Sequence, residues 1–464
     1  MQIPPFGFGP SEAIKQVSQW LGNPALNHAI KEAAQKLGIK EVPSATSVQE
    51  VLRQAGKWLE RTAEPWMAPG DPSAPRSLEV GINATGERFH PRWTAQPLSQ
   101  NACRLAAHLH SGYSQDPGIG QDLQRLLISA TGAADALVLR DIPTAVGLVV
   151  RAWMQDASMR PEPHIAPHVL LPRIACLRIP VSGTDAGVQL RPLIDATGAQ
   201  VTEIGSNSDC LHDDYAKATA MHPHSLIFQA TPITSTSQND DYAVIDHARS
   251  SGSLVCTLAF DASLNDLDWT ESKTPALTRR WDAGPDLFIA PTQYFLGGPD
   301  AVVILGKKNA IDRIRPWADQ LGAHADRLTQ ALLHCALSES LQPESWAKTP
   351  LGAMLSTPLA NTENRATRLA IQLQGLWPIQ RTEVSTQAMR IGNGIWQSLQ
   401  LPTAVLKIYP QSISAAKLSE ALAQNQPPIW TQVYSDRIEL VLRSIDPADD
   451  AQIVQALSKL QPAA

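Results

Sequence analysis

Short runs of apolar residues alternate with helix-like patterns between residues 79 and 335, and this alternation most limits how the chain can fold. Each run has the length of a buried β-strand. The runs are Ala136–Leu139, His168–Leu171, Val201–Ile204, Ser225–Gln229, Leu254–Leu258, Leu287–Ala290 and Ala301–Leu305. Strands separated by helices favour a largely parallel sheet that helices cover. The sequence therefore predicts an α/β domain with a mostly parallel sheet.

The segments on either side differ from this central region. The first 65 residues have the periodicity of amphipathic helices, and the prolines between residues 65 and 75 predict a linker. After residue 345 the pattern predicts a strand at 403–409, a helix at 414–424, a hairpin of 429–434 and 438–442, and a helix that begins near Asp446. We therefore predict four segments: a helical domain (1–66), a Pro-rich linker (67–78), a large domain (79–340) and a small α+β domain (341–464).

The charge balance disfavours a polyanionic partner. Lysine and arginine total 38 against 44 aspartate and glutamate residues, which gives a net charge of −6. Binding to RNA needs clustered positive charge that neutralises phosphates, so we expect no tRNA binding. The start of the sequence lacks the pattern of a signal peptide, and no apolar run is long enough to cross a membrane. We expect a cytoplasmic protein without membrane contact.

Three groups of motifs occur in a fixed order along the chain. The first comprises Ile82–Gly86, His90, Pro97–Ser99 and Gly112–Ser114; the second, Phe295–Pro299 and Gly306–Lys308; the third, Gln426–Ile429 and Ile438–Arg443. Together they resemble the bacterial selenocysteine synthase family, the L-seryl-tRNA selenium transferases. The resemblance covers nearly the whole chain. It implies the fold of the fold-type I pyridoxal phosphate (PLP) transferases, with a large domain and a C-terminal small domain.

The resemblance also implies PLP chemistry, which needs a lysine for the Schiff base and an acid at the ring nitrogen. The family's lysine stands two residues before its LGGP motif, and counting back from Leu296–Pro299 places Tyr294 there. A phenol forms no imine. The position of the family's ring-nitrogen aspartate falls on Leu258, and Asp261 follows three residues later.

Other positions depart from the family in the same way. The nearest lysines, Lys307 and Lys308, belong to the separate GKK motif beyond the Gly-Gly-Pro turn. The family's arginines and its asparagine run fall on residues of other types, namely Ala95, the neighbourhood of Leu321 and His324, and the segment 137–144. We therefore predict that the chain carries no PLP and has no identifiable catalytic residue.

Three residues remain as candidates for ligand binding: Arg443, Tyr294 and His90. In fold-type I enzymes an arginine of the small domain often receives a substrate carboxylate, and a structural ion pair is an equally open interpretation of Arg443. Tyr294 either fills the space that the lysine and cofactor would occupy or acts as an unusual general acid. His90 belongs to the first motif group.

Two hypotheses follow from these positions. The chain is either a homologue that has lost PLP chemistry and works as a binding, regulatory or scaffold protein, which the tyrosine favours, or an active PLP-dependent selenium transferase or a related transferase or lyase that acts on an amino-acid substrate. The resemblance implies at least a homodimer, and Arg443 suggests a small anionic ligand. We expect no metal, because prolines interrupt the two close histidine pairs, His164 with His168 and His222 with His224.

Overall fold

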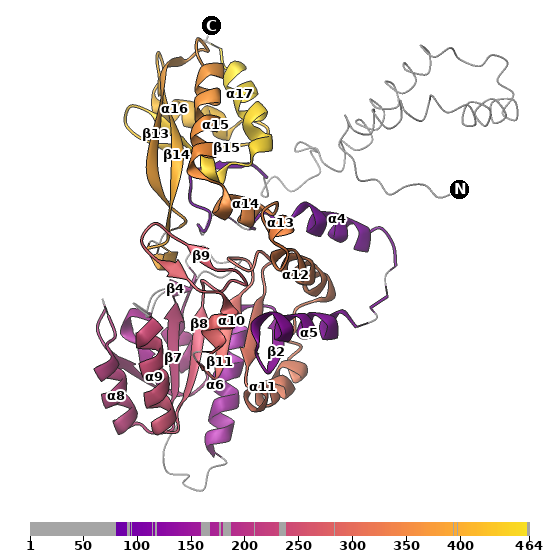
Figure 1. Cartoon of the computed structure of the whole chain (residues 1–464), viewed down its shortest axis with the longest axis vertical. Helices are drawn as coiled ribbons and strands as arrows, with labels where there is room; N and C mark the ends of the chain where they lie inside the picture. The colour runs from indigo at the N-terminus through magenta and orange to yellow at the C-terminus, as the bar shows by residue number, and fades with distance from the viewer. Residues whose placement is uncertain are drawn as a thin grey trace, which may run out of the picture. The chain divides into compact units, whose positions relative to one another are not determined.

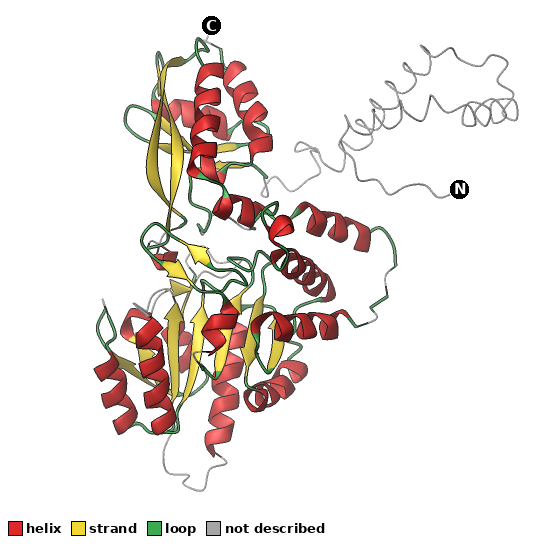
Figure 2. Cartoon of the chain, viewed as in Figure 1, coloured by secondary structure: helices red, strands yellow, loops and turns green. Residues whose placement is uncertain are grey.

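The chain divides into two compact units, residues 1–80 and 81–464. The computed structural model describes residues 80–461, apart from short gaps at 91–92, 94, 114, 117, 159–167, 176–177, 180–186, 208, 232–237, 283, 393 and 397. Figure 1 labels the elements of this part of the chain, and Figure 2 separates helices from strands. The predicted helical domain (1–66) and linker (67–78) lie outside the described residues.

A seven-stranded sheet forms the centre of the large domain, in the order β2-β12-β11-β8-β7-β3-β6. Strand β12 pairs antiparallel with both β2 and β11, whereas the pairs between β11 and β6 along the sheet are parallel. The strands are β2 (Asp135–Leu139), β3 (His168–Pro172), β6 (Gln200–Ile204), β7 (Leu226–Thr231), β8 (Leu254–Ala259), β11 (Leu287–Pro291) and β12 (Val302–Gly306). The mostly parallel sheet predicted from the sequence is confirmed, and each predicted apolar run is one of its strands.

Helices cover both faces of this sheet (Figure 2). One face packs against α6 (Ile142–Ser158), α7 (Leu190–Asp195) and α11 (Lys308–Gln320). The other packs against α5 (Ile119–Thr131), α8 (His212–Met221), α9 (Gln238–Ser250), α10 (Leu277–Asp282) and α12 (Arg327–Ser340). On β8, Cys256 and Leu258 join the first face and Val255 and Ala259 the second, as the two-residue period of a strand requires.

A second sheet, in the order β1-β15-β16-β14-β13, forms the small domain. Its strands are β1 (Ile82–Ala84), β13 (Ile379–Arg390), β14 (Gln400–Pro410), β15 (Ile429–Val433) and β16 (Ile438–Val441). Helices α15 (Leu359–Gln372), α16 (Ala415–Ala423) and α17 (Asp450–Ser458) bury their apolar sides against it. Although β1 lies within the range predicted for the large domain, it pairs in parallel with β15 of this sheet.

The remaining elements are short. They are α4 (Gln100–Leu109), β4 (Arg178–Ile179), β5 (Val188–Gln189), β9 (Leu267–Asp268), β10 (Lys273–Thr274), α13 (Pro343–Trp346), α14 (Pro350–Ser356) and four 3-10 turns, η1 (Arg173–Ala175), η2 (Gly394–Trp396), η3 (Leu442–Ser444) and η4 (Pro447–Asp449). The predicted C-terminal strand, helix, hairpin and last helix are confirmed as β14, α16, β15–β16 and α17. Within the described residues, no helix has the length and apolar character that crossing a membrane requires.

Candidate functional site

Tyr294 lies in the loop of residues 292–301 that joins β11 to β12. This loop is tied at its base, where the Thr292 amide donates to the Ala301 carbonyl (2.9 Å) and the Gly298 amide donates to the Thr292 carbonyl (2.9 Å). Gly297 has a positive φ of 67°, which glycine adopts without the cost that a side chain would add. The Gly-Gly sequence therefore folds the loop back and leaves Tyr294 4% exposed.

The Tyr294 ring belongs to a cluster of six buried aromatic side chains, which we call the aromatic cluster. Its members are Phe89, Phe260, Trp269, Tyr294, Phe295 and Trp396. The Tyr294 ring centroid lies 5.0 Å from that of Phe89 and 4.6 Å from that of Trp396, both edge to face. Such edge-to-face pairs add stability beyond the apolar area they bury. The cluster draws on both sheets: Phe260 follows β8 and Tyr294 follows β11 of the large sheet, whereas Phe89 follows β1 and Trp396 lies in η2, between β13 and β14 of the small-domain sheet.

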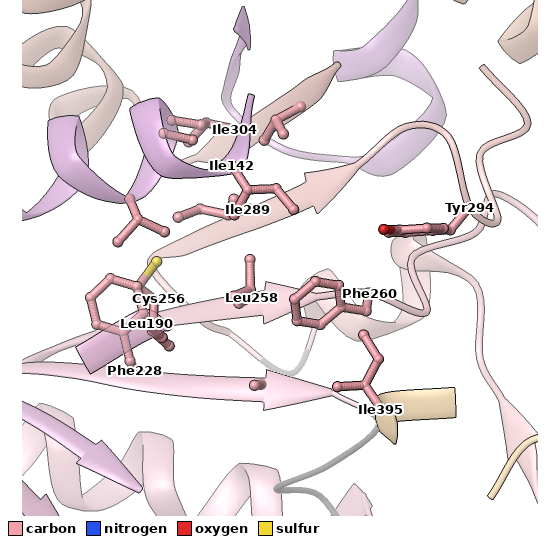
Figure 3. Close-up of a cluster of buried hydrophobic side chains, with 14 of the residues drawn as sticks. Ile142, Leu190, Phe228, Cys256, Leu258, Phe260, Ile289, Tyr294, Ile304 and Ile395 are labelled. Carbon is pink, nitrogen blue, oxygen red and sulfur yellow. The ribbon is translucent and has the colours of Figure 1, made fainter. Parts of the chain in front are cut away.

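The environment of Tyr294 keeps its phenol protonated. Burial raises the pKa of Tyr294 above its ordinary value, and a hydrogen bond with Gln293 opposes only part of that rise. A neutral phenol at neutral pH is neither a base nor a nucleophile. Figure 3 shows the ring beyond the end of β11, turned toward Phe260, among apolar side chains. The described contacts of Tyr294 are those of a packed core residue.

Leu258, at the position that the family gives to the ring acid, is fully buried on β8. It pairs in register with Ile289 of β11 and Ala230 of β7, and its side chain belongs to the apolar core against α6 (Figure 3). A leucine supplies no charge to a pyridinium nitrogen. The electron-withdrawing arrangement that PLP chemistry needs is therefore absent at this position.

Asp261, three residues later, is committed to another partner. The Arg280 Nη1 donates to Asp261 Oδ1 at 2.9 Å, and both side chains are about nine-tenths buried. The Thr231 hydroxyl donates to the same carboxylate oxygen (2.6 Å) and accepts from Arg280 Nη2 (2.6 Å). This closed triad neutralises Asp261 with an internal cation. No signal in the sequence marked Arg280, since it lies 19 residues away on α10.

Tyr294 follows the C-terminal end of β11, whereas Lys307 and Lys308 lie beside the N-terminal end of that strand. Because β12 is antiparallel to β11, its last residue, Gly306, pairs with the first residue of β11, Leu287. The length of β11 alone separates the two ends by about 14 Å. Lys307 Nζ instead contacts Asp286 Oδ1 at 2.5 Å, and Lys308 pairs with Asp312. Neither lysine therefore lies beside Tyr294, where the family motifs predict the Schiff-base lysine.

Arg443 lies in η3, just beyond the end of β16 rather than on the predicted strand, and is 7% exposed. Its Nε donates to the Pro402 carbonyl, and its Nη1 donates to the carbonyls of Met354 and Thr357, each at 2.8 Å. Burial lowers the pKa of Arg443 from its ordinary value. No described carboxylate pairs with it, so the ion pair that the sequence left open is replaced by carbonyl oxygens. Only Nη2 is left for an anion.

His90 is half-buried at the edge of the aromatic cluster. Its Nε2 lies 3.7 Å from Glu87 Oε2, and its ring packs edge to face with Trp93 at 6.3 Å. The preceding residue, Phe89, contacts Tyr294, whereas no hydrogen bond or ring contact in the described part of the chain joins Arg443 to Tyr294. No hydrogen bond within the described residues brings Arg443 into the aromatic cluster that contains Tyr294.

The described residues contain no group of three or more metal-ligating side chains. His168 instead stacks on His222, with ring centroids 4.0 Å apart. Burial and the nearby His222 lower the pKa of His168. His164 lies outside the described residues. The described part of the chain thus gives His168 a stacked aromatic neighbour and adds no third ligating side chain to the pair.

The sheet with its single antiparallel strand, the covering helices and the small C-terminal domain make up the fold that fold-type I PLP-dependent enzymes share. A solved structure of D-glucosaminate-6-phosphate ammonia-lyase shares this fold with a TM-score of 0.58. The two chains are 14% identical, and the match covers 84% of this chain and 98% of the other. The predicted fold class is confirmed.

The chain belongs to the L-seryl-tRNA selenium transferase family, whose profile matches residues 120–446. It is 26% identical over 406 residues to the L-seryl-tRNA(Sec) selenium transferase of Clostridium perfringens strain 13, with 83% of each chain covered. The protein of the same description from Nitratidesulfovibrio vulgaris is 24% identical over 393 residues, which cover 81% of this chain and 80% of that one. The predicted resemblance is confirmed.

The residues at the expected cofactor position do not fit a covalently held PLP. Where the family motifs predict the amine stands a buried phenol, where they predict the ring acid stands a buried leucine, and the nearest aspartate is paired with Arg280. These substitutions were predicted from the sequence, whereas the aromatic cluster was not. Of its members, Phe295 lies in a motif, at the start of the second group, whereas Phe89 lies between motifs and Trp396 lies about 300 residues beyond Phe89.

Proposed function

We propose that this chain is a selenocysteine-synthase-like homologue that has lost PLP chemistry and works as a binding, regulatory or scaffold protein. The observation that carries the proposal is Tyr294, which replaces an obligatory covalent residue and packs in the aromatic cluster. Leu258 and the Asp261–Arg280 pair support it, since restoring a lysine alone would leave the ring nitrogen without an acid. Family membership alone implies the fold rather than the reaction.

The other parts of the proposal concern partners and location. We propose a homodimer in the cytoplasm, because fold-type I sites lie between subunits, with a small anion as ligand and without tRNA as a partner. The net charge of −6 supports the last point, since tRNA binding depends on neutralised phosphates. Arg443 Nη2, Tyr294 and His90 remain candidate ligand contacts.

The experiment that tests the loss of PLP chemistry is a titration of the purified full chain with PLP, followed by absorbance. An internal Schiff base absorbs near the visible edge, and we expect no such band to saturate. The Clostridium perfringens relative, treated identically, is the positive control. A saturable band together with transfer of selenium to seryl-tRNA would instead support the competing proposal, an active PLP-dependent selenium transferase.

The Tyr294→Lys variant belongs in the same titration. We expect it to give no transferase activity, because Leu258 still stands at the ring-acid position and Asp261 still pairs with Arg280. Activity recovered by this single substitution would show that the remaining groups suffice. It would contradict the proposal that chemistry was lost at several positions.

A further inference from the structure

Arg88 is buried in the segment that follows β1, next to the aromatic cluster. Its side chain and backbone together are 9% exposed. The Arg88 carbonyl accepts a hydrogen bond from Gln96 Nε2 (3.1 Å), and the amide of the next residue, Phe89, donates to the Ile391 carbonyl (3.0 Å). The Gly86 amide, two residues earlier, donates to the Ser444 hydroxyl (3.1 Å). The backbone that carries Arg88 is therefore held on both sides.

The guanidinium of Arg88 has no partner among the residues that the structure describes. Its Nε is sealed from solvent without an acceptor, and no described carboxylate forms an ion pair with it. Because 9% of Arg88 remains exposed, the residue is not closed off completely, and we place the ligand at Nη1 and Nη2. Burial alone lowers the pKa of Arg88 to about 10, so the group stays charged at neutral pH.

The other deeply buried arginines of the described chain are all satisfied. Arg280 pairs with Asp261 and Thr231. Arg365 makes a two-pronged pair with Asp450 and also donates to three backbone carbonyls. Arg443 donates to three carbonyls. The fold thus supplies acceptors to its buried guanidinium groups, and Arg88 is the exception.

A second donor without a described acceptor belongs to the aromatic cluster. The Trp396 indole Nε1 is buried without an acceptor in the described residues. Its ring centroid lies 5.1 Å from that of Phe89, the residue next to Arg88. Arg88 and the aromatic cluster thus each carry a buried donor without a described acceptor, and an anion would complement either donor.

We propose that Arg88 binds a small oxyanion, a carboxylate or a phosphate group, beside the aromatic cluster. A buried charge without a partner is costly, and the planar guanidinium fork fits two oxygens of one carboxylate or phosphate. The ligand therefore supplies the partner that the fold gives to its other buried arginines. The proposal rests on the anionic ligand of the proposed function and names its binding residue. The PLP titration measures Schiff-base formation and not oxyanion binding, so the oxyanion proposal and the proposed loss of PLP chemistry can each fail while the other holds.

Calorimetric titration of the full chain tests this proposal, with inorganic phosphate and malonate as probes and sodium chloride at equal ionic strength as the control. We expect saturable binding of at least one probe to the unchanged protein. Arg88→Met should weaken it about 10-fold to 100-fold, the effect of losing charge-assisted hydrogen bonds. Arg88→Lys keeps the positive charge but lacks the planar guanidinium group, so its affinity for the probe should lie between those of the unchanged protein and Arg88→Met. Binding of phosphate alone or malonate alone identifies the group that Arg88 prefers.

Thermal unfolding without added oxyanion separates ligand binding from a structural role. Arg88→Met should leave the Tm unchanged or raise it, since the substitution removes an unpaired buried charge. The matched control, Arg365→Met, should lower the Tm because it leaves Asp450 and several carbonyls without their donor. The proposal is overturned if neither probe binds, if Arg88→Met binds the probe as the unchanged protein does, or if it lowers the Tm as much as Arg365→Met does.

Discussion

The Tyr294→Ala variant is expected to lower the free energy of unfolding by about 3–5 kcal/mol, the range for removing a large aromatic side chain from a packed core. Tyr294 is 4% exposed, and its ring contacts Phe89, Phe260 and Trp396. Truncation to alanine removes these contacts and leaves a cavity in the aromatic cluster. Urea unfolding of the full chain measures the effect.

Two matched variants show whether packing is the cause. Tyr294→Phe keeps the ring and loses only the hydroxyl, so we expect a loss of about 1 kcal/mol or less. Tyr113→Ala removes the same side chain from a fully exposed position and should change stability by about 0.5 kcal/mol or less. If Tyr294→Ala costs no more than Tyr113→Ala, the ring does not fill a core, and the assignment of Tyr294 as a packing residue is wrong.

The Asp261→Ala variant is expected to lower the free energy of unfolding by about 3–5 kcal/mol, because it leaves a buried Arg280 without its anion. The guanidinium would keep only the Thr231 hydroxyl and the face of the Phe288 ring, 5.5 Å away. The expected loss is that of breaking a buried pair, and it exceeds what the pair itself contributes.

A double variant and a surface control complete this experiment. Adding Arg280→Met to Asp261→Ala removes the stranded charge, so we expect the double variant to recover most of the lost stability. Asp268→Ala breaks the exposed pair with Lys273 (2.9 Å) and should cost about 0.5 kcal/mol or less. Equal losses in Asp261→Ala and Asp268→Ala would show that Asp261 is not committed to Arg280 and remains available to a ligand.

The strands of the large sheet were predictable because they are buried on both faces. Continuous apolar runs such as Leu287–Pro291 carry that signal directly. The direction of a strand leaves no mark in its composition, so the antiparallel β12 was not foreseen. The antiparallel direction of β12 keeps Lys307 away from Tyr294, because it places the lysine beside the start of β11 and the tyrosine lies beyond the end of that strand. Strand β13 was missed because most of its side chains are polar and partly exposed.

The site was predictable only at positions that the family motifs fix. Counting from Leu296–Pro299 located Tyr294, and the segment after β8 located Leu258 and Asp261. These residues contact side chains from distant parts of the chain, and no local sequence pattern predicts such contacts. Trp396 packs on Tyr294 across 102 residues, and Arg443 donates to carbonyls that lie 86 and 89 residues away. These contacts could be identified only from the three-dimensional structure.

The central claim is that no lysine of this chain forms an imine with PLP. The most direct measurement is borohydride reduction of the full chain after incubation with stoichiometric PLP, followed by peptide mass spectrometry. We predict that no lysine carries a pyridoxyl adduct at a level near one per chain. Tyr294 occupies the position predicted for the lysine, and Lys307 pairs with Asp286 beside the start of β11. A stoichiometric adduct on Lys307, Lys308 or any other single lysine would contradict the account.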